Sequence, residues 1–302
     1  MEQNKSFFWP QGILIALVCL TGTVGIGFMM LVKPNASEAQ SNQNLSVNET
    51  PANVGTQERI EELKTIMLNS WQQEAQAKGV APDVPLRFQG ATIKEAKLPP
   101  EEKVIALTFD DGPWPKSTTQ VLDILKKNKV KGTFFVVGQN VKNYPDLTKR
   151  VVAEGHTIAN HTWHHWYHHM NPQMAAYEID KTTDIIYKTT GVKTSLFRPP
   201  GGIMTNGVAG YARNNKYAII MWSSDSVDYS RPSVPKLINN IFRAAKPGGI
   251  VLMHDGGGDR THTVKALPEI INKFRKQGYR FVTIPELLEL QDKNQQLVAN
   301  KK

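Results

Sequence analysis

The chain has 302 residues, of which 40% are hydrophobic and 21% are charged, and its formal net charge is +9. This composition excludes a disordered or low-complexity protein and leaves room for one enzyme-sized domain with a smaller flanking region. The basic residues are scattered, without a dense Lys/Arg block interleaved with aromatic residues, so we expect no nucleic-acid partner.

An uncharged and mostly apolar run covers residues 12–32, which is the length of a helix that spans a membrane. Aromatic residues at positions 7–9 precede it, as at a membrane interface. The alternative is a signal peptide cleaved near Ser37 and Ala39, but the apolar run is longer than a signal core, so we favour an uncleaved anchor. Both alternatives place the rest of the chain outside the cytoplasmic membrane. Cys19, the only cysteine, lies inside this run, which excludes cysteine-based chemistry from the exported part.

Composition divides the chain into five expected segments. Residues 34–57 are rich in Asn, Ser, Gln and Thr, which is typical of a flexible tether. Apolar side chains then recur at helical spacing from residue 58 to 78, which predicts an amphipathic helix. The expected segments are a cytoplasmic N-terminus and anchor over 1–33, a linker over 34–57, a helical or extended flank over 58–100, the main domain over 101–290 and a polar tail over 291–302.

Short apolar runs alternate with helix-like segments after Pro99 and Pro100. This order predicts an α/β fold of parallel strands with crossover helices, and about seven such units favour a distorted, incompletely closed (β/α) barrel. In such a barrel the chemistry lies where strands end, at the carboxyl edge of the sheet. The expected strands cover residues 104–109, 133–137, 157–160, 196–198, 217–222, 249–254 and 280–283, and the expected helices cover residues 120–128, 174–189, 234–245 and 264–277.

Two adjacent carboxylates, Asp110 and Asp111, end the first of these strands and are followed by Gly112. Neighbouring side chains on a strand point in opposite directions, so one carboxylate can face a metal while the other faces a water molecule. Two carboxylates this close repel each other unless a cation separates their roles. The alternative is an Asp-Gly turn in which an aspartate caps a helix.

Six of the eight histidines lie close together in the sequence, which is typical of a metal site. His161 and His165 are four residues apart, so two imidazoles on one helical turn can share a metal. The pairs His164/His168 and His165/His169 have the same spacing, so spacing alone leaves the ligand pair open, as does a proton-buffering or aromatic-packing cluster. Two histidines and one aspartate would leave open positions on the metal, as a catalytic site requires.

Three further polar residues stand at predicted strand ends. His254 is a candidate general acid, because hydrolysis of an amide requires a proton on the departing nitrogen, and the alternative is a structural histidine that caps the strand. Asp228 can hold that imidazole in its charged form. Arg198 can pair with a carboxylate and tune its pKa.

Five short sequences occur in the order and spacing of known motifs: TFDDG at 108–112, HTWHH at 161–165, RPPGG at 198–202, DSVDY at 225–229 and LMH at 252–254. They resemble the five motifs of the polysaccharide deacetylases, carbohydrate esterase family 4 with the NodB-homology domain, over about residues 101–290. The resemblance implies a metal-dependent hydrolase that removes N-acetyl groups from N-acetylglucosamine in a polysaccharide. An anchor and a long tether favour peptidoglycan as the polymer. Chitin oligomers and acetylated xylan are alternatives within the family, and a saccharide-binding protein without turnover is an alternative of another class.

The resemblance also implies the roles of the acid–base residues. Asp110 is the expected catalytic base, and Arg198 is expected to contact it. His254 is the expected acid that protonates the leaving nitrogen, and Asp228 is expected to tune it.

The metal ligands follow from the resemblance in the same way. Asp111, His161 and His165 are expected to bind one divalent ion, zinc or a substitute such as cobalt. Thr162 matches the small hydroxyl residue of the family and selects the His161/His165 register.

Three matching positions concern the substrate, and two of them depart from the family pattern. Leu252 is expected to line the pocket for the acetate methyl. Gly201 stands where an aromatic residue is usual, so the backbone N–H expected at the oxyanion remains but the side chain that walls the site is missing. Tyr229 stands where tryptophan is commoner. Since no metal ligand or proton-transfer group is lost, we expect activity with an altered substrate preference.

Overall fold

The computed structural model describes residues 84–299, together with Arg59. The expected membrane segment, the linker and most of the flank therefore lie outside the described residues. Within the described part, none of the helices combines the length and the apolar character needed to cross a bilayer.

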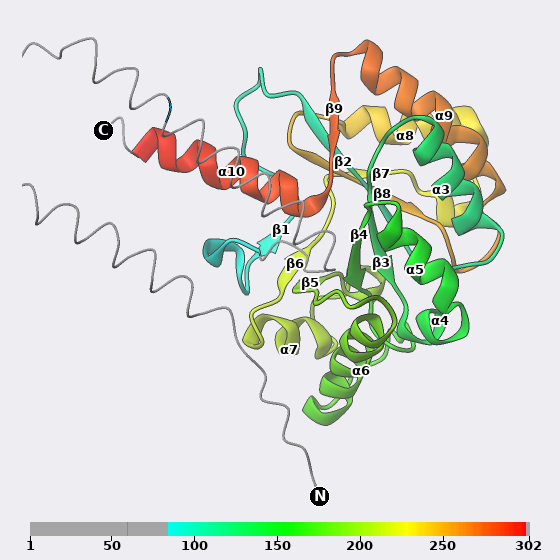
Figure 1. Ribbon diagram of the computed structural model, residues 1–302, viewed down its shortest axis with the longest axis vertical. Coiled ribbons are helices and arrows are strands. Elements are labelled where there is room, and N and C mark those ends of the chain that lie inside the picture. The colour runs from blue at the N-terminus through cyan, green and yellow to red at the C-terminus, as the bar shows by residue number, and fades with distance from the viewer. Residues whose placement is uncertain (1–58, 60–83, 300–302) are drawn as a thin grey trace, which may run out of the picture. The chain divides into compact units, whose positions relative to one another are not determined.

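Between residues 84 and 299, nine strands form one curled sheet, and every strand pairing in it is parallel (Figure 1). The strand order is β1-β6-β5-β4-β3-β2-β8-β7, and β9 also pairs with β2. Only residues 221–223 separate β6 from β7, which lie near opposite ends of this order, so the sheet must curl until these strands approach each other. The strands are β1 Thr92–Ile93, β2 Val104–Asp110, β3 Thr133–Val136, β4 Thr157–Asn160, β5 Leu196–Phe197, β6 Ala218–Ile220, β7 Ser224–Asp225, β8 Gly249–His254 and β9 Arg280–Val282.

The predicted α/β class with parallel, incompletely closed strands is confirmed, and all seven predicted strands are present. The predicted number of strands is nevertheless too low, because the sequence pattern does not reveal β1 and β7. Each of these strands has only two residues, which is too short for an apolar run or an alternating pattern to be recognised.

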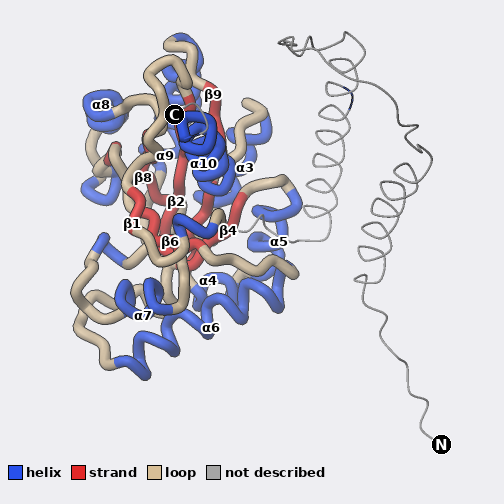
Figure 2. The backbone as a smooth tube through the Cα atoms, turned by 90° about the vertical axis from the view of Figure 1, so that its left-hand side faces the viewer, coloured by secondary structure: helices blue, strands red, loops and turns tan. Residues whose placement is uncertain are grey.

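Helices α3, α8 and α9 pack against the outer face of the sheet, and α6 and α7 lie together near one end of the strands (Figure 2). The four predicted helices correspond to α3, α6, α8 and α9. The short helices α4, α5 and α7 were not predicted, because six to nine residues give too few turns for a helical period to stand out. The helices are α3 Ser117–Lys127, α4 Gly138–Asn143, α5 Pro145–Ala153, α6 Pro172–Thr190, α7 Val208–Asn214, α8 Val234–Ala244, α9 Thr261–Lys276 and α10 Ile284–Ala299, with short 3-10 turns η1 Leu86–Phe88, η2 Pro200–Gly202 and η3 Asp228–Ser230.

Helix α10 runs through the boundary predicted at residue 290, so most of the expected polar tail is helical. Gln291, just past that boundary, is buried, and its Oε1 accepts a hydrogen bond of 3.0 Å from the backbone N–H of Lys97. The polar composition of this segment therefore reflects a helix that has one side exposed to solvent and the other side packed against the domain.

Strand β2 shows how the core leads to the site. All seven of its residues are buried. Ile105, Leu107 and Phe109 pack with helix residues in the outer core, whereas Val104 and Ala106 belong to the inner core of the barrel. Because side chains alternate along a strand, the inner row continues through Thr108 to Asp110. The barrel interior thus changes from apolar to polar at the carboxyl end of β2.

Candidate metal centre and active site

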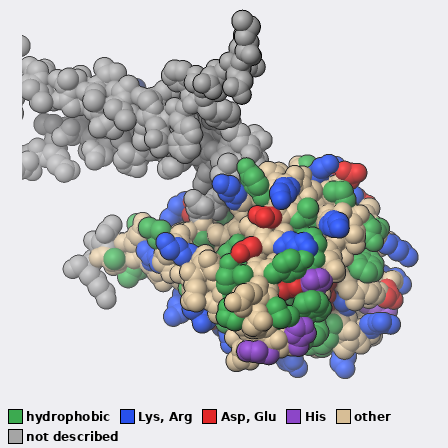
Figure 3. All heavy atoms as spheres, turned by 90° about the horizontal axis from the view of Figure 1, so that it is seen from below, with side chains coloured by type: hydrophobic (Ala, Val, Ile, Leu, Met, Phe, Trp, Pro, Cys, Tyr) green, Lys and Arg blue, Asp and Glu red, His purple; other side chains and the backbone are tan. Residues whose placement is uncertain are grey.

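A cavity of about 770 Å³ opens at the carboxyl ends of the strands. The face seen in Figure 3 gathers histidine side chains among acidic and hydrophobic ones. Arg198 and Asp228 lie behind the cavity wall, where they contact Asp110 and His254. The other eight predicted site residues line the cavity: Asp110, Asp111, His161, His165, Gly201, Tyr229, Leu252 and His254.

Asp111, His161 and His165 converge on one point, with one ligand atom from each lying within 4.8 Å of the others. Oδ1 of Asp111 lies 3.1 Å from Nε2 of His165 and 3.4 Å from Nε2 of His161. In the described part of the chain, no other trio of His, Cys, Asp or Glu side chains converges in this way. The structure therefore selects one of the three histidine pairs that spacing alone left open.

The two histidines meet through a loop, which differs from the helical turn expected from their spacing. Residues 161–165 are not helical, and Thr162 and His165 adopt positive φ values of 68° and 62°. Oδ1 of Asn160 accepts a hydrogen bond of 2.8 Å from the N–H of Thr162, and Oγ1 of Thr162 accepts one of 3.1 Å from the N–H of His165. These bonds bend the chain so that both imidazoles face Asp111.

The state of the three side chains fits a divalent cation. Nδ1 of His161 lies 2.7 Å from the carbonyl oxygen of Arg198, so Nδ1 carries the proton and Nε2 presents its lone pair to the site. Oδ1 of Asp111 is buried and accepts no hydrogen bond, although two imidazole nitrogens are close. Burial alone would raise the pKa of Asp111, but His161 and His165 hold it well below its usual value. An ionised carboxylate and two imidazoles, with positions left open, form a typical catalytic site for a metal such as zinc.

Asp110 lies beside this centre and is fixed by a buried arginine. Arg198 is fully buried, and its Nη1 donates hydrogen bonds to Oδ1 of Asp110 at 2.6 Å and to Oγ1 of Thr108 at 2.9 Å. The guanidinium also stacks on the ring of Phe135, 4.0 Å from its centroid. Oδ2 of Asp110 remains directed to the site, 3.7 Å from Nε2 of His161. Arg198 thus orients one oxygen of the carboxylate and leaves the other for a ligand.

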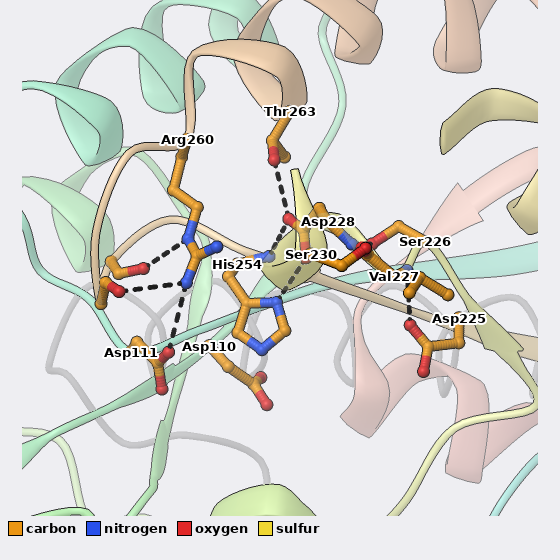
Figure 4. A network of polar contacts seen from close by, with 12 residues as sticks. Asp110, Asp111, Asp225, Ser226, Val227, Asp228, Ser230, His254, Arg260 and Thr263 are labelled. Atoms are coloured by element: carbon orange, nitrogen blue, oxygen red, sulfur yellow. Dashed lines mark hydrogen bonds and ion pairs between the residues drawn. The ribbon is translucent and has the colours of Figure 1, made fainter. Parts of the chain in front are cut away.

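His254 and Asp228 form a second polar unit in the same site. Nδ1 of His254 donates to Oδ1 of Asp228 at 2.6 Å, and Oδ2 of Asp228 accepts from the backbone N–H of His254 and from the hydroxyl of Thr263. Burial would lower the pKa of His254, but the bond to Asp228 and nearby carboxylates raise it to about 9. Burial would raise the pKa of Asp228, but His254 lowers it. The other ring nitrogen of His254 is turned toward Asp110 (Figure 4).

Residues at the start of α9 contact both the candidate metal centre and the His254–Asp228 pair. The sequence did not predict these two contacts. Nη2 of Arg260, the residue before α9, lies 3.8 Å from Oδ2 of Asp111, while Thr263 in the first turn binds Asp228 (Figure 4). The guanidinium is itself held by the carbonyl of Gly256 at 2.6 Å from Nε. The glycine run at 256–258, which begins two residues after the end of β8, is a sequence signal that this loop approaches the site closely.

The substrate positions also lie at the cavity. Gly201 belongs to η2, and among the described residues its N–H donates to no protein group. Leu252 is buried in β8 and lines the cavity, and Tyr229 is exposed with its ring edge-on to His254 at 5.9 Å between centroids. Tyr167, which the sequence did not single out, lines the same cavity close to Gly201.

Comparison with known proteins agrees with this geometry. The family model for polysaccharide deacetylases matches residues 97–220. A peptidoglycan-N-acetylglucosamine deacetylase of Bacillus cereus is 45% identical over 195 residues, which cover 64% of this chain and 91% of that protein. The chain belongs to the polysaccharide deacetylase family.

Solved structures place the chain in the same family. The crystal structure of the Bc1960 peptidoglycan N-acetylglucosamine deacetylase superposes with a TM-score of 0.62 at 34% identity, covering 67% of this chain and 94% of that one. BA3943 of Bacillus anthracis, a family pseudoenzyme, superposes with a TM-score of 0.62 at 31% identity, covering 69% and 73%. Since the family contains a pseudoenzyme, turnover by this polysaccharide deacetylase has to be argued from its own site.

Proposed function

We propose that this protein is a zinc-dependent deacetylase that removes N-acetyl groups from N-acetylglucosamine in peptidoglycan. The observation that carries the proposal is the intact set of polar groups around one cavity. A candidate site for a cation is made of Asp111, His161 and His165. Beside it, in the same cavity, lie a carboxylate held by Arg198 and an imidazole held in its charged form.

Different residues of the chain carry out the different steps of the reaction. A bound divalent ion supplies Lewis acidity toward water and the amide carbonyl. Oδ2 of Asp110 accepts the proton of the attacking water while Arg198 holds Oδ1. The N–H of Gly201 donates to the carbonyl oxygen as negative charge develops there. His254 donates its Nε2 proton to the departing nitrogen, so acetate and a free amino sugar leave.

The cellular setting is part of the proposal. The apolar run at 12–32 supports a single-pass membrane anchor, and the polar segment at 34–57 supports a tether that carries the catalytic domain outside the membrane. A domain held there meets peptidoglycan, the polymer named for the Bacillus cereus relative. Cleavage of the apolar run would instead give a secreted enzyme.

The alternatives to peptidoglycan deacetylation are a different polysaccharide substrate and a protein that binds saccharides without turnover. Gly201 and Tyr229 alter the substrate side of the site, which keeps chitin oligomers and acetylated xylan open. A saccharide-binding protein without turnover is disfavoured, because the proton-transfer residues Asp110 and His254 and their partners are all present.

Product analysis tests the proposal directly. The full chain loaded with zinc is incubated with peptidoglycan, N-acetylglucosamine oligomers and acetylxylan, and released acetate is measured with and without chelator. Asp110→Asn is expected to abolish turnover and keep the metal, His161→Ala to lose both, and the exposed His262→Ala to retain both. Full activity in Asp110→Asn, or no acetate from any substrate with the wild type, would overturn the proposal.

A further inference from the structure

A second, shallow hollow of about 360 Å³ lies beside the catalytic cavity. Trp166, Tyr177 and Met174 form its apolar part, and His164 lines both this hollow and the catalytic cavity. The hollow and the catalytic cavity therefore lie next to each other, with the side chain of His164 at their boundary. The hollow lies between the loop that follows β4 and the first turns of α6.

The aromatic rings of this hollow lie nearly parallel to one another. The rings of His164 and Trp166 stack with centroids 4.0 Å apart and an interplanar angle of 8°. Tyr177 lies 6.1 Å from His164 at an angle of 17°. The ring of His168 also lies 5.0 Å from that of Trp166, at an angle of 36°. Trp166 and Tyr177 nevertheless keep 37% and 46% of their surface exposed, so part of each side chain is available to a ligand.

Partners from α6 hold two of these rings in place. Glu178 is fully buried and accepts hydrogen bonds from the backbone N–H groups of Trp163 and His164 at 2.9 and 2.8 Å, and it also pairs with Nδ1 of His164. The ammonium of Lys181 contacts the hydroxyl of Tyr177 and lies 4.4 Å from the centroid of its ring. The surface is thus formed before any ligand arrives, which lowers the entropic cost of binding.

Amide groups stand at the edge of the rings. Asn171 and Gln173 line the hollow and are exposed. Oδ1 of Asn171 caps α6 by accepting from the N–H of Met174 at 2.9 Å. Within residues 84–299, neither Nδ2 of Asn171 nor the amide of Gln173 has a hydrogen-bond partner in the protein.

This combination matches the chemistry of a sugar ring. A pyranose presents C–H groups on a face, which pack on the electron-rich face of an aromatic ring, and hydroxyl or acetamido groups at its edge, which bond to amides. We propose that His164, Trp166 and Tyr177 form a subsite for another sugar residue of the glycan whose N-acetyl group occupies the catalytic cavity. This inference rests on the proposed function, and it predicts that the enzyme favours longer chains.

Chain-length dependence of the kinetics tests the subsite. The full, zinc-loaded chain is assayed with N-acetylglucosamine oligomers from the dimer to the hexamer. Trp166→Ala is expected to lower kcat/KM for the hexamer about tenfold and to leave kcat/KM for the dimer nearly unchanged. For the hexamer, KM is expected to rise by a larger factor than kcat falls. Trp166→Phe restores most of the preference. Tyr187→Ala, which removes an exposed aromatic ring of α6 outside both hollows, is the matched control.

Binding without turnover gives an independent readout. In the Asp110→Asn background, calorimetry with the hexamer is expected to show about tenfold weaker binding when Trp166→Ala is added, and no change with the dimer. A wild type that deacetylates while Trp166→Ala keeps the full length preference would overturn the subsite alone. A wild type that releases no acetate from any oligomer would overturn the proposed function instead.

Discussion

The ring of Tyr167 occupies the space that a side chain at position 201 would fill. A Cβ built on Gly201 would lie 2.9 Å from Cε1 of Tyr167, and Gly201 has a φ of +60°, a conformation that favours glycine. The same ring stands edge-on to His165 with centroids 5.2 Å apart. The aromatic wall that the sequence shows to be missing at position 201 is therefore supplied by the loop after β4.

Removal of this wall should weaken catalysis without removing the metal. Tyr167→Ala exposes one side of the cavity and frees the ring of His165, so we expect kcat/KM to fall about tenfold, within the range that misplaced groups cost. Tyr167→Phe keeps the ring and should stay near wild type. Acetate release and bound zinc are measured in each variant. Unchanged kinetics in Tyr167→Ala would show that the ring has no part in shaping the site.

Arg260 should affect metal affinity more than any proton-transfer step. Its guanidinium lies 3.8 Å from Oδ2 of Asp111, the oxygen that does not face the histidines. Loss of an outer partner of a ligand typically costs about 10- to 100-fold in metal affinity. We expect Arg260→Gln to weaken zinc binding by at least about tenfold in competition with a chelating dye. Arg231→Gln, an exposed arginine of the same cavity without a contact to Asp111, is the control, and equal affinities in both variants would contradict this role.

The pH dependence of the reaction should report on Asp228. In the wild type the pKa of His254 is about 9, so the imidazole is charged below that pH and the acid is lost as the pH rises through it. In Asp228→Asn the carboxylate no longer favours the charged form, while burial still disfavours it, so the pKa of His254 falls. The alkaline limb of kcat/KM should therefore move to lower pH, with about a 100-fold loss at pH 8. An alkaline limb that stays in place would assign it to another group.

The sequence predicts those elements and residues whose signal is local. β4 and β8 have the predicted bounds and β2 differs by one residue, because each is a continuous buried run between loops. Asp110, Asp111 and His254 were found for a similar reason, since each ends a recognisable strand.

Contacts between distant parts of the chain were not visible in the same way. Arg260 reaches Asp111 from the loop after the neighbouring strand β8, and Tyr167 reaches Gly201 from a different loop, so no spacing in the sequence encodes either contact. The pairing of His161 with His165 was expected from helical geometry, but it depends on positive φ values in a loop, which a helical period does not describe.

Glu178 should stabilise the fold of the loop that presents the histidines. Its buried carboxylate accepts the N–H groups of Trp163 and His164 through one oxygen and contacts the imidazole of His164 through the other. Glu178→Gln keeps one oxygen that can accept both N–H groups but turns an NH2 group toward Nδ1 of His164 in place of an acceptor. An unsatisfied donor costs about 1–3 kcal/mol, and we expect Glu178→Gln to lower the free energy of unfolding by about that amount. Glu178→Ala should lower it further, because truncation also leaves a cavity.

Urea denaturation at neutral pH measures the effect of Glu178. Asp184→Asn, at an exposed acidic residue of the same helix, removes a charge from α6 without removing a buried acceptor and should change stability by less than about 0.5 kcal/mol. Because the loop also carries His161 and His165, zinc affinity should fall together with stability in Glu178→Gln. If Glu178→Gln unfolds at the same urea concentration as Asp184→Asn and binds zinc normally, the loop is held by other contacts, and the pre-formed geometry of the two histidines does not depend on this carboxylate.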